Sequence, residues 1–165
     1  METERGTVQG VRWLGESHHT LDDKNRVFVP RKLQGGLGRD AEGHLTAILT
    51  RGFEGCLFLF SESGFERVLS RLKTQAFDGA QQRKLQRLFF ANTQRTTLDG
   101  SGRLLVPEKL KALVGIDRDV VLVGLVDRIE LWPKPAWERF ERENAGEFDA
   151  LAEVLCGPRG PVPES

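Results

Sequence analysis

The same polar motif, an aspartate followed four positions later by an arginine, occurs twice in the 165-residue chain. Asp22 and Arg26 form the first copy, and Asp99 and Arg103 form the second. An aspartate can close a tight turn by accepting hydrogen bonds from backbone N–H groups. An arginine offers paired donors to a phosphate or to the edge of a guanine. The motif therefore fits two roles: a staple that joins each Asp to its Arg, and a turn that presents arginines to nucleic acid.

Basic residues are concentrated around the first copy of the motif. Lys24, Arg26, Arg31 and Lys32 fall within nine positions, whereas the second copy has Ser101 where the first has Lys24. The whole chain has 24 basic and 24 acidic residues and a formal net charge of +0. Any affinity for nucleic acid must therefore come from local placement of charge rather than from bulk charge. A cluster of charges is also typical of an ordinary solvated surface, so the residues alone leave both interpretations open.

The chain lacks the side-chain sets that catalysis or metal binding needs. Its three histidines, His18, His19 and His44, show no spacing typical of metal ligands. The glycine-rich stretch 35–38 is not followed by the Lys-Ser/Thr pair of a phosphate-binding loop. The two cysteines form no CxxC motif, which disfavours a zinc site and fits a reducing compartment. The sequence therefore predicts no enzyme activity, no metal and no cofactor.

The composition is that of an ordinary globular domain. Hydrophobic residues make up 39% of the chain and charged residues 29%, which argues against a wholly disordered protein. No stretch approaches 18 apolar residues, and the N-terminus lacks the apolar run of a signal peptide. We therefore expect one cytoplasmic domain that does not span a membrane.

The polar motif belongs to a longer internal repeat. Residues 20–33 read TLDDKNRVFVPRKL and residues 97–110 read TLDGSGRLLVPEKL, with eight of fourteen positions identical. A second block follows in each half, ILTRGFEGCLFLF at 48–60 and VVLVGLVDRIELW at 120–132. One such unit cannot bury its own apolar face, so we expect the two copies to close over each other into a small pseudo-twofold barrel.

Each half is expected to contain a strand, a tight turn, a second strand and a short helix. Asn25 and Gly102 fall at the same place in the turn, and both residue types tolerate a positive φ. Pro30 and Pro107 stand where a helix would begin. We expect each strand–turn–strand segment to be a hairpin. Its packed side chains are Leu21, Val27, Val29, Leu98, Leu104 and Val106.

Two more strands and at least one helix complete each half. The strands are predicted at 45–51, 56–60, 119–124 and 128–132. A helix is expected after Ser63, whose spacing to Glu66 is that of a capping box, and another at 79–91. The apolar spacing after Trp137 favours a single C-terminal helix, weakened at Gly146.

The predicted fold class is thus α+β and strand-rich, with peripheral helices. The expected segments are a first repeat at 16–64, connecting helices at 65–92, a second repeat at 93–136, a C-terminal helix at 137–156 and a disordered, Pro/Gly-rich tail at 157–165.

Five blocks of the sequence together resemble the MraZ family of bacterial proteins, which belongs to the AbrB/SpoVT-like group of DNA-binding β-barrels. The blocks are LDDKNRVFVP, LDGSGRLLVP, RGFEGCLFLF, QRLFFAN and VVLVGLVDRIELW, and the resemblance covers about residues 13–140. It implies a double-split β-barrel and a ring-shaped homo-oligomer. It also implies a transcriptional regulator, typically a repressor, of the cell-division and cell-wall gene cluster that contains its own gene. The ligand so implied is double-stranded DNA with short direct repeats in the promoter.

The resemblance also assigns roles to individual residues. Lys24, Arg26 and Arg103 match the basic positions of the family motif. The local basic cluster adds Arg31 and Lys32 to the predicted DNA-binding set. Structural roles fall on the remaining motif positions, Asp22, Asn25, Pro30, Asp99, Gly102 and Pro107. Asn25 stands where the family usually has Gly, and Gln34 where it often has Arg.

Three hypotheses are compared on these residues. The first is a sequence-specific DNA-binding regulator, cytoplasmic and associated with the nucleoid, and retention of both motif arginines favours it. The second is an oligomeric interaction or structural module that keeps the barrel without binding DNA. The third is an enzyme, which the lack of any nucleophile–base or metal set disfavours. Because the chain is neutral, the first hypothesis needs several weak DNA-binding patches to act together in one oligomer.

Overall fold

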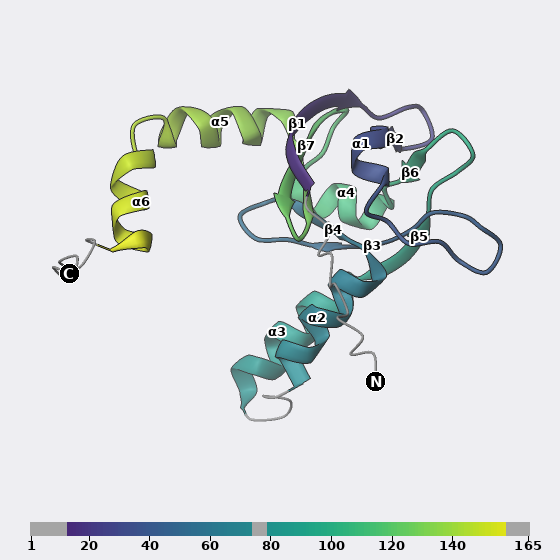
Figure 1. The fold of residues 1–165 in the computed structure, drawn as a ribbon, viewed down its shortest axis with the longest axis horizontal. Coiled ribbons are helices and arrows are strands. Elements are labelled where there is room, and N and C mark those ends of the chain that lie inside the picture. The colour runs from purple at the N-terminus through teal and green to yellow at the C-terminus, as the bar shows by residue number, and fades with distance from the viewer. Residues whose placement is uncertain (1–12, 74–78, 158–165) are drawn as a thin grey trace, which may run out of the picture. The chain divides into compact units, whose positions relative to one another are not determined.

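The computed structural model describes residues 13–73 and 79–157. These residues form two compact units, a body that extends to Lys134 and a smaller C-terminal unit that begins at Pro135. All strands seen in Figure 1 belong to the body.

The strands of the body form two antiparallel sheets. Their bounds are β1 Trp13–Thr20, β2 Arg26–Phe28, β3 Thr46–Arg51, β4 Leu57–Phe60, β5 Gln94–Thr97, β6 Arg103–Leu105, β7 Asp119–Val126 and β8 Ile129–Pro133. Six of them form one sheet in the order β1-β7-β8-β4-β3-β5, and β2 pairs with β6 in a separate two-stranded ribbon. The strand-rich α+β class is therefore confirmed, and the four strands predicted at 45–51, 56–60, 119–124 and 128–132 are present.

The prediction that each strand–turn–strand segment is a hairpin is wrong. The turn after β1 leads into β2, but β1 pairs with β7 and β2 pairs with β6, so the strands on either side of the turn lie in different sheets. The turn carries the chain from one sheet to the other, and each strand finds its partner in the opposite repeat. Local sequence cannot reveal this pairing, because a tight turn between two strands looks the same in both cases.

Among the described residues the body contains four helices. They are α1 Arg31–Gln34, α2 Glu62–Lys73, α3 Ala80–Phe90 and α4 Glu108–Val114. Figure 1 shows α2 and α3 projecting away from the strands. Pro30 and Pro107 lie immediately before α1 and α4, and Gly115 ends α4 with a left-handed φ of 73°. The start of α2 differs from the expected capping box: the hydroxyl of Ser61, not Ser63, accepts a hydrogen bond from the N–H of Gly64 at 3.0 Å.

The C-terminal unit contains two helices where one was predicted. Helix α5 spans Lys134–Asn144 and helix α6 spans Phe148–Cys156. The break falls around Gly146, where a glycine lowers the helix propensity by about 1 kcal/mol relative to alanine. Of the predicted tail, residues 158–165 lie outside the described part of the chain.

A single hydrophobic core joins the ribbon to the six-stranded sheet. All six side chains predicted to be packed, among them Val27, Val29, Leu104 and Val106, are buried in it. Leu49, Leu59, Leu122 and Leu131 from the six-stranded sheet belong to the same core. The two repeats therefore share one interior. Closure of the strands into a double-split barrel stays a prediction.

Two glycines at equivalent positions of the repeat permit close packing in the sheet. A Cβ on Gly124 would lie 2.6 Å from the backbone nitrogen of Leu14 in the neighbouring strand β1. A Cβ on Gly52 would lie 2.7 Å from the ring of Phe58. Both approaches are too short for any side chain, so the repeat retains glycine for packing.

The part of the chain that the structure describes contains no helix long and apolar enough to cross a membrane.

We predict that Val106→Ala lowers the free energy of unfolding by about 1–3 kcal/mol, because it leaves a cavity in the shared core. Val106 is fully buried, whereas its neighbour Leu105 is half exposed on the outer face of the ribbon. The matched control Leu105→Ala should change stability by less than about 0.5 kcal/mol. Urea denaturation of both variants measures the difference. Equal losses for the two would show that the ribbon does not bury the face described here.

Candidate nucleic-acid interface

Each motif aspartate closes its turn with the same hydrogen bonds. The Oδ1 atom of Asp22 accepts from the backbone N–H groups of Lys24 and Arg26, both at 2.9 Å. The Oδ1 atom of Asp99 accepts from Ser101 and Arg103 at the same distances. In the structure, each aspartate therefore closes its own turn through backbone hydrogen bonds.

The four motif side chains from the two repeats meet in one ionic network. Within each turn, the arginine Nε donates to its own aspartate Oδ2 at 2.8 Å. Across the repeats, Arg103 Nη1 lies 3.6 Å from Asp22 Oδ2, and Arg26 Nη1 lies 3.9 Å from Asp99 Oδ2. About a third of each of these four side chains is exposed to solvent. The antiparallel pairing of β2 with β6 brings the two turns together, and the network lies at their junction.

The turn geometry also determines the charge state of the aspartates. Hydrogen bonds from backbone N–H groups, first that of Arg26, and then the Arg26 guanidinium hold the pKa of Asp22 below its usual value of 3.8. The equivalent donors around Arg103 and Ser101 lower the pKa of Asp99 in the same way. Both carboxylates are therefore ionised at neutral pH, and each faces a positively charged guanidinium.

The outer face of the β2–β6 ribbon combines these arginines with apolar side chains. Arg26 lies opposite Leu105 in the register, and Phe28 lies opposite Arg103. Phe28 and Leu105 are exposed, while Val27 and Leu104 between them point into the core. A two-stranded antiparallel ribbon is one of the elements that the DNA major groove admits.

The two turns differ at the position with positive φ. Asn25 has φ 59° and Gly102 has φ 77°, as the sequence predicted. The Asn25 side chain donates to Glu108 Oε1 at 2.6 Å and accepts from Lys111 Nζ at 3.0 Å, which joins the first turn to helix α4 of the second repeat.

Around the second turn the equivalent contact comes from helix α1. Gln34 donates to the carbonyl of Val29, and its Nε2 atom would lie 2.4 Å from a Cβ on Gly102. The glycine in the second turn therefore leaves room for Gln34. Both departures from the family pattern, Asn25 and Gln34, thus make contacts in the structure.

The structure does not bring all the predicted basic residues into the network. Lys24, Arg31 and Lys32 are exposed, and within residues 13–73 and 79–157 their side chains form no hydrogen bond or ion pair. Lys24 sits on the first turn itself. Lys32 lies along strand β1, since its Nζ is 3.6 Å from where Gly15 would carry a Cβ.

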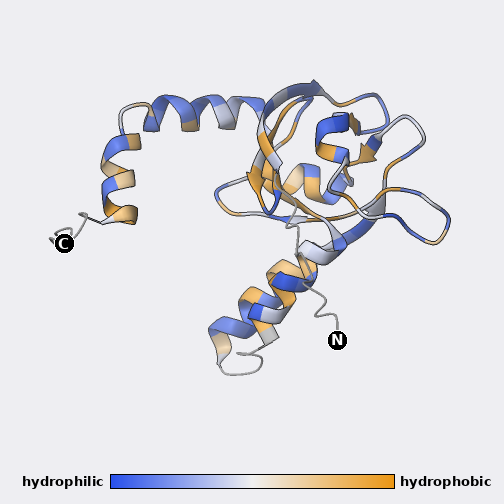
Figure 2. Ribbon diagram, in the orientation of Figure 1, coloured by the Kyte–Doolittle hydropathy of each residue, from blue (hydrophilic) through white to orange (hydrophobic). Residues whose placement is uncertain are grey.

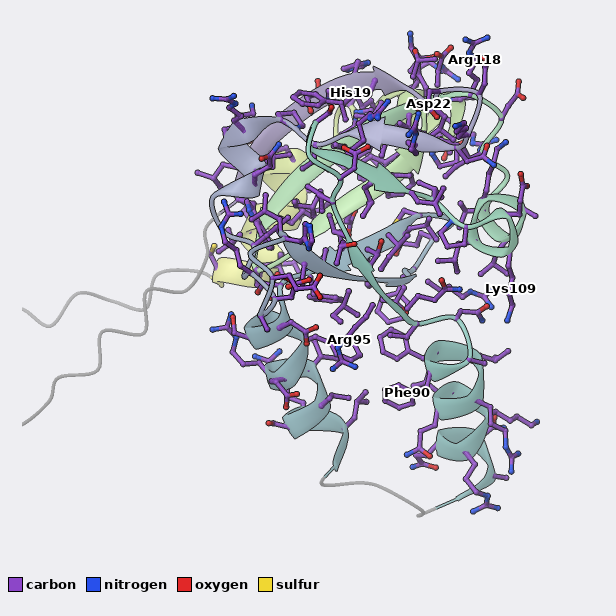
Figure 3. All side chains as sticks on the ribbon, turned by 90° about the vertical axis from the view of Figure 1, so that its right-hand side faces the viewer. His19, Asp22, Phe90, Arg95, Lys109 and Arg118 are labelled. Atoms are coloured by element: carbon purple, nitrogen blue, oxygen red, sulfur yellow. The ribbon has the colours of Figure 1, made fainter. Side chains whose placement is uncertain are left out.

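One basic residue near the first turn was missed by the sequence analysis. The carbonyl of Arg118 accepts from the N–H of Leu21 at 2.9 Å, and Figure 3 shows Arg118 and Asp22 at the same end of the body. The Arg118 side chain is exposed. It precedes β7, far from Asp22 in sequence, so no local spacing could have indicated it.

A possible metal-ligand group also escaped the sequence analysis. The donor atoms of Asp40, Glu42 and His44 lie within 4.8 Å of one another in the loop before β3. The Asp40 carboxylate accepts hydrogen bonds from the backbone N–H groups of Glu42 and His44, and these bonds stabilise the loop. The group is largely exposed, and we assign it no metal.

The fold and the site define a class of protein: a strand-rich α+β chain built from two copies of one unit, joined at a duplicated Asp–Arg turn. The sequence model of the family described as MraZ protein, putative antitoxin-like, matches residues 13–88 and again 89–156. The Transcriptional regulator MraZ of Moorella thermoacetica is 34% identical over 143 residues, which cover 87% of this chain and 96% of that protein. The proteins of the same name from Clostridium beijerinckii and Lactobacillus helveticus are 36% and 34% identical over the same share of each chain. The chain therefore belongs to the MraZ family.

We predict that Asp22→Asn lowers the melting temperature at pH 7 and that the difference from wild type narrows in acid. The folded-state pKa of Asp22 is depressed, so its stabilising contribution is present above the unfolded pKa near 3.8 and is lost as pH falls through the folded value. Melting curves of wild type and variant between pH 3 and 7 measure the narrowing. The control is Asp23→Asn, which changes an exposed neighbour in the same turn. A difference between Asp22→Asn and wild type that is the same at pH 3 and pH 7 would contradict this assignment.

Proposed function

We propose that this protein is a transcriptional regulator that binds double-stranded DNA through the β2–β6 ribbon and its two turns. The observation that carries the proposal is the ionic network of Asp22, Arg26, Asp99 and Arg103, which holds two arginines in fixed positions on an exposed ribbon. The names of the related regulators support the same function.

In this proposal, different residues supply the affinity and the specificity of DNA binding. The two carboxylates of the network balance its two guanidinium groups, so it contributes little net attraction for phosphate. Attraction in this proposal comes instead from exposed cations outside the network, first Lys24 on the turn and Arg118 beside it. Arg31 and Lys32 extend the same set. Phosphate contacts supply affinity and salt dependence, while contacts to base edges supply specificity.

The motif arginines are proposed to read base edges. Their Nε atoms are held by the aspartates, and the Nη2 atoms form no hydrogen bond among the described residues. A guanidinium whose plane is already fixed loses less entropy when it donates to a guanine. Phe28 and Leu105 beside them offer apolar contact, for which the methyl group of thymine is the matching surface.

The wider function follows the family resemblance. We propose a homo-oligomer whose subunits bind short direct repeats together, so that several weak sites give one strong attachment. The proposed operator lies upstream of the protein's own gene, in a cell-division and cell-wall cluster that the protein represses. Association with the nucleoid would follow from this activity. We also propose that the two sheets close into a double-split barrel.

The second candidate function is an interaction or structural module without DNA binding. The mutual pairing of all four motif charges favours it, because an ionic network of this kind can join the two repeats without contacting any ligand. The two functions predict different results when Lys24 or Arg26 is substituted.

We predict that Lys24→Ala weakens binding to the upstream DNA without lowering the melting temperature. Lys24 is exposed and its side chain makes no bond among the described residues, so its loss leaves the fold intact. Loss of one phosphate contact per subunit lowers the slope of log K against log salt by about 1 per subunit. Fluorescence anisotropy with the upstream DNA at several salt concentrations measures the slope.

The control for Lys24→Ala is Lys84→Ala on helix α3, which lies at the end of the body away from Asp22 in Figure 3. It removes the same charge and should leave the salt slope unchanged. Equal effects of the two variants would show that only net charge matters and would contradict a site at the turn.

We predict that Arg26→Ala abolishes preference for the upstream DNA over unrelated DNA. Loss of a guanine contact costs about 1–3 kcal/mol per subunit and falls on the cognate sequence. Arg26→Lys keeps the positive charge and removes the planar donor pair, so it should lose the same preference while retaining binding to unrelated DNA. Competition binding and melting curves on the same proteins decide between the roles. A lowered melting temperature with unchanged DNA preference would favour the structural module.

A further inference from the structure

Helices α2 and α3 form the walls of an apolar groove at the end of the body away from Asp22 (Figure 3). The cavity between them has a volume of about 290 Å³ and is lined by Leu72, Leu85, Phe89 and Phe90 from the helices and by Phe58 from the sheet. A second cavity of about 270 Å³ shares Leu85 and Phe89 with the first and continues the groove.

Large apolar side chains of the groove are exposed to solvent. Phe53 is 64% exposed, Leu88 55% and Leu85 50%, and all three line one or both cavities. The floor of the groove is a row of aromatic rings in contact, from Phe53 through Phe58 to Phe60. A contiguous exposed apolar surface of this kind marks a binding site.

The C-terminal unit carries a complementary apolar surface. In helix α6, Phe148, Leu151, Ala152 and Leu155 follow each other at three- and four-residue spacing and form one stripe. Phe148 is 79% exposed and Leu155 is 85% exposed. The hydropathy colouring of Figure 2 shows α6 as largely apolar, with apolar residues also along α2 and α3.

The charges of the two surfaces are opposite. Helices α2 and α3 carry six basic residues against two acidic ones. Arg51, Arg71 and Arg128 line the two cavities of the groove together with the acidic residues Asp127 and Glu54, so the positive excess comes from the helices. Helix α6 and the residue before it carry Glu147, Asp149 and Glu153 and no lysine or arginine. Complementary potentials of this kind favour the encounter of two surfaces and select the correct partner.

We propose that helix α6 of one copy of this chain docks in the α2–α3 groove of a second copy. The inference rests on the self-association in the proposed function and names the surfaces that make it. Each subunit then offers one groove and one helix, which is a head-to-tail contact that generates rings or filaments. Such a contact leaves all subunits pointing the same way, as direct DNA repeats require. It also leaves the β2–β6 ribbon uncovered, because Asp22 and Phe90 lie at different ends of the body (Figure 3).

The first test uses one charged substitution on each surface. Leu85→Asp places a carboxylate in the groove, and Leu155→Asp places one in the helix stripe; both positions are exposed, so each variant should still fold. Loss of one large apolar contact weakens self-association by about tenfold to a hundredfold. Size-exclusion chromatography with light scattering should show an oligomeric wild type and smaller species for both variants. The control Leu113→Asp, on helix α4 outside the groove, should behave as wild type.

Mixing the two variants distinguishes docking of α6 in the groove of a second copy from docking in the groove of its own chain. Leu85→Asp subunits keep an intact helix and Leu155→Asp subunits keep an intact groove, so an equal mixture should form dimers through the one intact pair. No dimer in the mixture would mean that α6 docks in the groove of its own chain and would overturn the proposal. A wild type that oligomerises while neither variant changes size overturns it too, and leaves the proposed DNA binding untouched. A monomeric wild type overturns the docking and the proposed self-association together, whereas Lys24→Ala tests DNA binding separately.

A covalent test uses the chain's own cysteines. Cys156 at the end of α6 is exposed, whereas Cys56 is buried and its thiol has its pKa raised to about 12 by burial, so it does not react. Leu88→Cys adds a thiol at the groove, and a bismaleimide should then join Leu88→Cys subunits into a ladder of dimers and larger products. Cys156→Ser in the same background should remove the ladder. Cross-links confined to single chains, or none at all, would contradict docking between copies.

Discussion

The antiparallel pairing of β2 with β6 is the interaction on which the rest of the structure depends. These are the strands that follow the two Asp–Arg turns, one from each repeat, and their pairing brings the turns together. It also places Val27 and Leu104 in the core that the ribbon shares with the six-stranded sheet. Neither repeat can form this ribbon alone, because each supplies only one of its strands. The ribbon therefore requires one strand from each of the two repeats.

The same pairing gives the motif charges their partners. Within a single turn, Asp22 and Arg26 would form an ordinary exposed ion pair, which contributes little to stability. Next to the second turn, each arginine faces both aspartates, and the hydrogen bonds of the turns fix the carboxylates in place. Networks of charges with fixed geometry hold side chains better than isolated pairs do. The ribbon thus presents guanidinium groups whose positions are determined before any ligand arrives.

The sequence predicted what depends on neighbouring residues and missed what depends on distant ones. The turns with positive φ at Asn25 and Gly102, the short helices after the prolines and the buried valines of the ribbon all follow from local residue type and spacing. The pairing of β1 with β7 does not, because alternation along a strand says nothing about which strand lies beside it. Arg118 was missed for the same reason.

The C-terminal region shows a different limit of sequence reasoning. The apolar spacing from Trp137 onward is consistent with a single helix, and it continues in register beyond Gly146. The chain nevertheless breaks there into α5 and α6, since periodicity records which face is apolar but not whether the helix is continuous. The apolar stripe of α6 was predicted only as part of that single helix, and its exposure became visible in the structure.

The neutral charge of the chain and its exposed apolar surfaces have a common explanation in the proposed assembly. A ribbon in which aspartates offset arginines attracts DNA weakly, so one subunit would bind poorly and would be easily released. Linking several such subunits raises the effective concentration of each ribbon at its repeat, and overall affinity then depends on how firmly the subunits hold one another. In the proposed assembly, the α2–α3 groove and α6 join the subunits through surfaces separate from the ribbon. Regulation of self-association would then regulate DNA binding without any change in the residues that contact DNA.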